Sequence, residues 1–251
     1  MNYGQRALSL GCKGPDVAEL QLRLAGFLGT EPHGDFDETT KLQVTTFQQD
    51  VLGMQPTGIV DRRTMQGIDA FGAQHPFDFA QLRCPCGKCQ GFGQGRGMGV
   101  YSGTPGDEKG YQYEYPGMHR MLLWAVRALY HYMSDYRFTV NSGYRCRDSN
   151  AMHGRDTTNH HGKAIDLGVD LAPGESAFTS QSAPNVARAV LQATAHAQIG
   201  WSHLNQKALE PASIAPTWVH YDVRCYERKY LGDEMFCTTL AQLDGRMPVS
   251  F

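Results

Sequence analysis

The spacing of apolar residues changes along this 251-residue chain, and the change constrains its fold most. Up to about residue 72, apolar residues recur every three or four positions, as in amphipathic helices. Beyond residue 135, short runs rich in β-branched and aromatic residues alternate with loops, which is typical of short strands. The sequence therefore predicts an α+β fold. An all-α domain of three helices, residues 1–72, precedes a domain at 73–251 with a small antiparallel sheet, flanking helices and long loops.

Three helices are predicted in the first domain. The first follows a Gly-Pro-Asp start signal at 14–16. The second lies within 38–53, where the apolar residues share one face and Gly53 marks the end. The third is shorter and begins near Asp61.

Two helices and four short strands are predicted in the second domain. The run 118–133 carries an apolar stripe typical of a core helix. Another helix, within 184–197, has Ser182 as its cap and Gly200 after its end. The strands are expected at 137–145, 163–170, 199–202 and 218–224. The glycine-rich segment 91–117 is expected to form a flap or rim over a site.

Charge and hydropathy exclude two kinds of partner. The 23 basic and 25 acidic residues nearly cancel, and basic residues form no long block, so no nucleic acid is expected as a partner. No apolar run approaches the roughly 18–20 residues that a membrane span requires. Residues 1–14 lack the apolar segment of a secretory signal, so no export signal of that kind is expected.

The seven cysteines are an odd number, which a complete set of disulfides cannot use. Cys84, Cys86 and Cys89 could hold a structural zinc ion together with a distant cysteine, or could form disulfides in an oxidising compartment. At most one pair among these three can close locally. Cys225 and Cys237 are candidate disulfide partners.

Two adjacent histidines, His160 and His161, precede a Gly-x-Ala-x-Asp run that ends at Asp166. An imidazole and a carboxylate at the two ends of a tight turn can bind one divalent ion, and Zn²⁺ accepts both kinds of ligand. Taken singly, the stretch is more typical of a solvated polar turn.

Two further stretches carry groups suited to catalysis. His220 and Asp222 lie on one face of a predicted strand, and a third ligand from a separate strand is what a catalytic zinc site needs. Ordinary polar alternation on a half-exposed strand would give the same pattern. Arg145 ends another predicted strand and suits bidentate contact with a carboxylate, although a surface salt bridge would use the same residue.

Residues 8–70 resemble the three-helix peptidoglycan-binding domain found beside many cell-wall hydrolases. The matching elements occur in order: Gly14, Asp16-Val17, Leu20-Gln21, Leu24, Gly34-Asp35-Phe36, Thr39, Phe47-Gln48, Gly58 and Val60-Asp61. The resemblance implies that the domain at 1–72 binds peptidoglycan. The alternative is a small helical module that only packs on a catalytic domain.

The second domain resembles the zinc D-Ala-D-Ala carboxypeptidase family, which shares its core with hedgehog-type and lysostaphin-type metallopeptidases. The resemblance covers about 77–230 and depends on the order of Ser-Gly-Tyr-Arg, then His with Gly-x-Ala-x-Asp, then Trp-Val-His-x-Asp. It implies that His160, Asp166 and His220 hold Zn²⁺. It also implies that Arg145 faces the substrate's carboxylate or the polarised carbonyl.

This chain departs from the family pattern in two places. The family usually places six residues between the histidine and the aspartate, whereas five separate His160 from Asp166, so alignment can also select Asn159. His160 is favoured because asparagine is a poor zinc ligand, and His161 is the alternative. Many relatives carry an acid three residues before the last histidine, where this chain has Thr217.

Another group must therefore accept and deliver the proton. Asp222 is the nearest carboxylate in sequence and the first candidate for this catalytic role. It could equally orient His220 through the other ring nitrogen. Glu210, His203 and His153 are candidates from loops.

The resemblance implies a zinc-dependent peptidoglycan hydrolase that cleaves stem-peptide bonds next to D-alanine, as a D,D-endopeptidase or D,D-carboxypeptidase. It would act in the periplasm or cell wall, as a phage lysin released through a membrane pore or as an antibacterial effector moved by a secretion machinery. An immunity protein would be a further partner of an effector. The alternative is a non-catalytic cell-wall-binding protein with a degenerate zinc peptidase fold, for which Thr217 and the shortened turn are the evidence.

Overall fold

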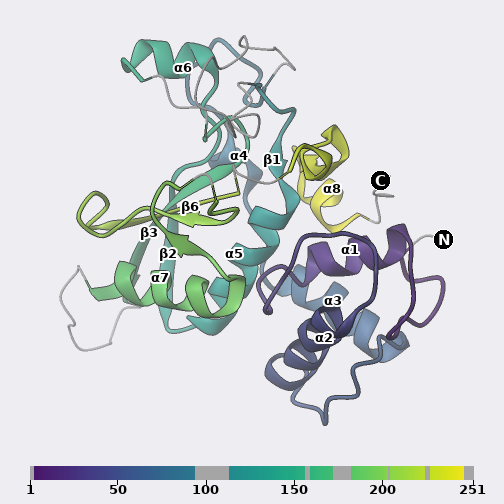
Figure 1. Ribbon diagram of the computed structural model, residues 1–251. Coiled ribbons are helices and arrows are strands. Elements are labelled where there is room, and N and C mark those ends of the chain that lie inside the picture. The colour runs from purple at the N-terminus through teal and green to yellow at the C-terminus, as the bar shows by residue number, and fades with distance from the viewer. Residues whose placement is uncertain are drawn as a thin grey trace.

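The computed structural model describes residues 3–93, 113–155, 159–171, 182–202, 204–223 and 227–245. Helices near the N-terminus form one unit, and a second unit is built on a mixed sheet with helices on its sides (Figure 1). The predicted α+β class is confirmed. In these ranges no helix is long and apolar enough to cross a membrane.

The N-terminal unit contains the three predicted helices, α1 (Pro15–Arg23), α2 (Glu38–Asp50) and α3 (Arg62–Gln74). The side chains of Asp37 and Asp61 accept hydrogen bonds from the backbone of Thr40 and Thr64, at 2.8 Å each, and so cap α2 and α3. The rings of Phe27, Phe47 and Phe71 pack edge to face, with centroids 5.2–5.8 Å apart.

The main sheet has five strands in the order β2-β3-β6-β5-β4. All neighbours are antiparallel except β4 and β5, which are parallel. Their bounds are β2 (Tyr136–Ser142), β3 (Ala164–Leu171), β4 (Gln198–Ile199), β5 (Ala208–Leu209) and β6 (Trp218–Asp222). A second, two-stranded sheet pairs β1 (Met118–His119) with β7 (Phe236–Cys237). Strands β1, β5 and β7 escaped prediction because two residues are too few to show an alternation.

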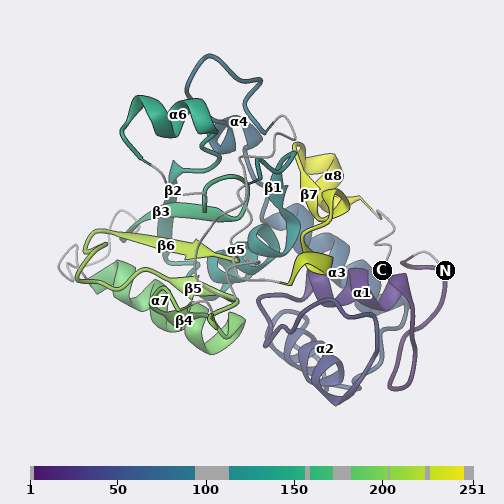
Figure 2. The same ribbon diagram turned by 45° about the horizontal axis from the view of Figure 1, so that its top comes forward.

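Two helices support the sheet. Helix α7 (Ser182–Ala195) packs on β3 and β6 and against the buried α5 (Arg120–Tyr132), as Figure 2 shows from a second direction. Gly200 lies after the end of α7, as predicted, but the helix already ends at Ala195, where His196 follows with a left-handed φ of 54°. The short helices are α4 (Phe79–Leu82), α6 (Arg147–Met152), η2 (Arg228–Tyr230), η3 (Asp233–Met235) and α8 (Leu240–Asp244).

Buried ion pairs join α1 to α5. Glu19 accepts two bonds from Arg120, at 2.7 and 2.9 Å, and one from Arg23 at 2.8 Å, and all three side chains are at most 1% exposed. Trp124 of α5 stacks on Phe71 of α3. One continuous cluster of buried apolar residues runs through both units. The predicted domain boundary at residue 72 falls within α3, which continues to Gln74.

Removal of the Glu19 carboxylate should therefore destabilise the whole chain. Glu19→Ala leaves two buried guanidinium groups without their shared partner, and we expect a loss of about 3–5 kcal/mol in the free energy of unfolding. Urea unfolding followed by circular dichroism measures this loss.

Lys13→Ala is the matched control, because Lys13 forms an exposed ion pair with Asp35. Its loss should cost less than about 1 kcal/mol. Equal losses for the two variants would show that the buried ion pairs stabilise the chain no more than an exposed pair does.

Candidate metal centre

The register of the sheet brings the polar residues of the site together. Asp166 of β3 lies opposite Ser142 of β2 on one side and opposite His220 of β6 on the other. The β2 ladder is irregular between Val140 and Ser142, and such bulges are frequent beside functional sites. Alternation along β3 sends the neighbouring Ile165 into the core, so Asp166 lies on the opposite face.

His160, Asp166 and His220 converge on one point. Their candidate ligand atoms all lie within 4.8 Å of one another. His160 Nε2 is 3.3 Å from Asp166 Oδ2, and His220 Nδ1 is 2.6 Å from Asp166 Oδ1. Two imidazole nitrogens and one carboxylate oxygen form a three-ligand set that suits Zn²⁺.

The backbone orients His160 for such a role. Its Nδ1 lies 2.7 Å from the carbonyl oxygen of Gly143, and because a carbonyl only accepts, Nδ1 carries the proton. Nε2 is therefore an acceptor. It is buried, faces the Asp166 carboxylate and makes no hydrogen bond. A buried lone pair directed at a carboxylate fits a cation between them.

His161 lies differently. Its Nε2 is 3.3 Å from the side-chain amide of Asn150, and burial lowers the pKa of His161 to about 4. Neither of its ring nitrogens belongs to the group of convergent ligand atoms. The geometry thus favours His160 over its neighbour.

Asp222 lies behind His220. The Nε2 atom of His220 is 3.1 Å from Asp222 Oδ2, and Asp222 is fully buried. Burial disfavours a charge on His220, but hydrogen bonds to Asp166 and Asp222 outweigh it and raise the pKa of His220 to about 9. Asp222 therefore holds the ring so that Nδ1 points at Asp166.

Asp166 is the electrostatic centre of the group. Burial would raise its pKa, yet the close approach of His160 and His220 lowers it well below the usual range. Arg145 Nη2 lies 3.9 Å from Asp166 Oδ2, and the backbone of Arg145 donates to the carbonyl of His160 at 2.8 Å. The arginine and the histidine are thus positioned by one another.

A cavity of about 580 Å³ opens onto this group. Asp166, Arg145 and Trp218 form part of its wall, together with Ala80, Gln81, Arg83, Pro85, Asn141, Ser142, Gly143, Tyr144, Ser149, His153 and Arg155. Trp201, whose ring centroid is 5.3 Å from that of His220, is a neighbour that the sequence pattern did not single out.

The candidates for proton transfer are spread around the site. Thr217 is exposed and has no carboxylate. Glu210 is half-buried, follows β5, and its backbone N–H donates to the carbonyl of His220. His153 lines the cavity and bonds to Ser149. His203 and most of the predicted 91–117 flap lie outside the described residues.

Comparisons with known proteins address both parts of the chain. Residues 13–67 match the family described as "Putative peptidoglycan binding domain". A curated relative, the zinc D-Ala-D-Ala carboxypeptidase of Streptomyces albus G, is 29% identical over 172 residues, which cover 64% of this chain and 61% of the relative. Both parts of the predicted resemblance are confirmed. The chain spans less than two thirds of the length of this zinc carboxypeptidase.

Gly162 allows the turn that carries His160, and its replacement tests the turn. It has a left-handed φ of 102°, and an added Cβ would overlap the carbonyl oxygen of Gly117. We expect Gly162→Ala to cost about 1–3 kcal/mol of overpacking in addition to about 1–2 kcal/mol of backbone strain. Denaturant unfolding measures the sum.

Gly154→Ala serves as control, since Gly154 is also left-handed, at 62°, but has open space around it. It should show the backbone strain alone. An equal loss of unfolding free energy in both variants would contradict the tight approach of Gly162 to Gly117.

Proposed function

We propose that this chain is a zinc-dependent peptidoglycan hydrolase that cleaves stem-peptide bonds next to D-alanine. The observation that carries the proposal is the convergence of His160, Asp166 and His220 beside a cavity that Asp166 and Arg145 line. The similarity to a zinc D-Ala-D-Ala carboxypeptidase and the match of residues 13–67 support the same substrate.

His160 Nε2, His220 Nδ1 and an Asp166 oxygen would hold the ion. Zinc with three protein ligands polarises a carbonyl and lowers the pKa of a water molecule. Gly143 and Asp222 orient the two imidazole rings through the nitrogen atoms that would not bind the ion. This support is expected to raise the affinity of the site for zinc.

Arg145 would bind the substrate. Its guanidinium lines the cavity, and its Nε is buried without a hydrogen-bond partner. A planar guanidinium can hold a terminal carboxylate through two parallel bonds, or stabilise the charge that develops on a carbonyl oxygen. A terminal carboxylate would make the enzyme a D,D-carboxypeptidase, and an internal carbonyl a D,D-endopeptidase.

We assign the proton-transfer role to Glu210. Asp222 is fully buried and already bonded to His220, so it is poorly placed to meet a substrate. Glu210 is half-buried, and its charge acts on Arg145 and His220. It directly follows β5, the neighbour of β6, and we propose that it supplies the carboxylate that Thr217 lacks.

The N-terminal unit would hold the enzyme on its substrate. A peptidoglycan-binding unit fixed beside a peptidase cavity concentrates the active site at the wall. Action in the periplasm or cell wall, as a phage lysin or a secreted effector with an immunity protein, is part of this proposal.

Digestion of purified peptidoglycan tests the function directly. The protein should release new amino groups or free D-alanine, and a chelator should abolish the release until zinc is returned. Mass analysis of muropeptides identifies the bond. His160→Ala should lose activity and the zinc ion held by His160, Asp166 and His220, whereas His161→Ala should retain that ion. Wall binding without any release would instead favour a non-catalytic wall-binding protein, and full activity of His160→Ala would overturn the ligand assignment.

Two further variants separate proton transfer from ligand orientation. Glu210→Gln should lower kcat by about 10²–10⁴-fold with unchanged zinc content. Asp222→Asn should instead weaken zinc binding by about 10–100-fold, because it removes the support of His220. Glu227→Gln, at an exposed ion pair with Lys229, is the control and should change neither. Unaltered kcat in Glu210→Gln would exclude Glu210 from the reaction.

A further inference from the structure

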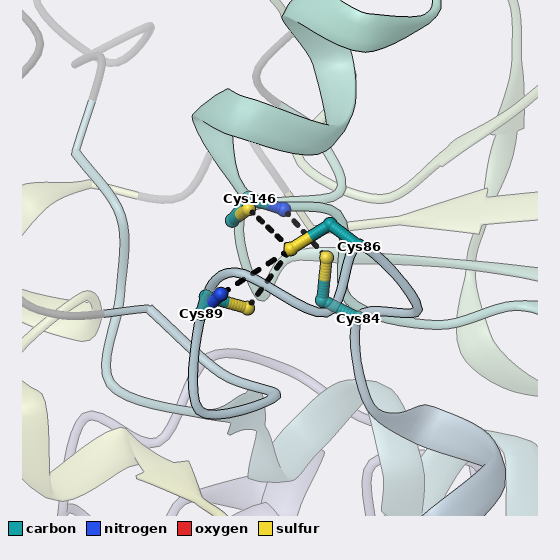
Figure 3. Close-up of side chains that lie close together, drawn as sticks. All are labelled: Cys84, Cys86, Cys89 and Cys146. Atoms are coloured by element: carbon teal, nitrogen blue, oxygen red, sulfur yellow. Dashed lines mark hydrogen bonds between the residues drawn. The ribbon is translucent and has the colours of Figure 1, made fainter.

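Four cysteine thiols gather at a second point, away from the His160 group. Cys84, Cys86 and Cys89 lie in the loop after α4, and Cys146 caps the start of α6 (Figure 3). Their four sulfur atoms all lie within 4.8 Å of one another. Cys146 is thus the distant cysteine that a zinc site at the Cys-Pro-Cys-Gly-Lys-Cys run requires.

The sulfur separations distinguish metal binding from disulfide formation. Cys86 Sγ lies 3.6 Å from Cys89 Sγ and 3.5 Å from Cys146 Sγ. A disulfide would require about 2.05 Å. Four sulfurs placed tetrahedrally about zinc, at about 2.3 Å each, are separated by about 3.8 Å. The observed separations are close to this value, and all four residues are free cysteines.

Backbone N–H groups point at every one of these sulfurs. Cys86 accepts from Lys88 and Cys89, and Cys89 accepts from Gly91, at 3.3–3.4 Å. Cys146 accepts from Ser149, and Cys84 accepts from the backbone of Cys146, both at 3.4 Å. Such donors stabilise negative charge on sulfur, so the loops are shaped for thiolates.

We propose that Cys84, Cys86, Cys89 and Cys146 bind a second, structural zinc ion. Four protein ligands close the coordination shell and leave no position for substrate, which is the arrangement of structural rather than catalytic zinc. The left-handed turn at Gly87, with φ of 68°, lets the chain bring Cys86 and Cys89 to the same ion.

This ion would position Arg145, a role that rests on the function proposed above. Cys146 directly follows Arg145, and the backbone of Tyr144 donates to the carbonyl of Leu82 at 2.8 Å. Arg83 and Pro85 of the same loop line the cavity. The ion would therefore tie the loop after α4 to the segment that carries the substrate-binding arginine.

Metal content and cobalt spectroscopy test the proposal on the full-length protein. After gel filtration, the wild type should contain two zinc ions per chain. His220→Ala and Cys146→Ser should each retain one, and Cys12→Ser, at a partly exposed cysteine of the N-terminal unit, should retain both. Cobalt in the protein should give the intense near-ultraviolet bands of sulfur-to-cobalt charge transfer. These bands should persist in His220→Ala and disappear in Cys146→Ser.

The test separates this site from the catalytic one. Cys146→Ser should raise KM by about 10–100-fold while kcat changes less, because it releases Arg145 rather than the catalytic metal. Cys89→Ser, at a partly exposed position, is a second variant in case Cys146→Ser does not fold. A cobalt-loaded wild type without charge-transfer bands, or a disulfide among these cysteines by mass spectrometry, would overturn the site. Two bound zinc ions without peptidoglycan cleavage would overturn the proposed function and leave this site standing.

Discussion

The site depends on the contacts that the Asp166 carboxylate makes with the imidazole rings of His160 and His220. The carboxylate is mostly buried, yet it is held in the ionised form because His160 and His220 approach it from either side and Arg145 lies close by. A buried carboxylate is costly unless positive groups or hydrogen bonds surround it. Neighbouring groups keep the two rings in place around the carboxylate. The Gly143 carbonyl orients the ring of His160, and Asp222 orients the ring of His220.

The positions of Asp166 and His220 depend on the register of the sheet. Asp166 and His220 are partners across β3 and β6, so their separation is fixed by the ladder rather than by flexible loops. A slip of one residue would turn His220 into the core and bring Val219 or Tyr221 to the cavity. The helix α7 opposes such a slip because it packs on both strands from the other face.

The sequence allowed the fold to be predicted where patterns were long. Helices α1, α2, α3, α5 and α7 and strands β2, β3 and β6 each carry enough residues to show a period, and all were expected. The candidate ligands came from the resemblance, since a His-His-Gly turn alone does not distinguish a metal site from a solvated turn. The choice of His160 could not be derived from spacing, because it depends on which ring meets the Gly143 carbonyl. Likewise, the grouping of Cys146 with three cysteines about sixty positions earlier is a long-range contact that no local period records.

The buried pairs of Glu19 with Arg120 and Arg23 have a mechanical consequence. Modules joined by a flexible linker search a volume set by the linker's length. Here α1 and α5 are joined by ion pairs that are almost inaccessible to water, so neither helix can rotate relative to the other without breaking these pairs. A protein anchored to a wall through its N-terminal unit would therefore reach bonds at one set distance from its anchor. The geometry of the polymer, rather than diffusion of a tethered domain, would then decide where it cuts.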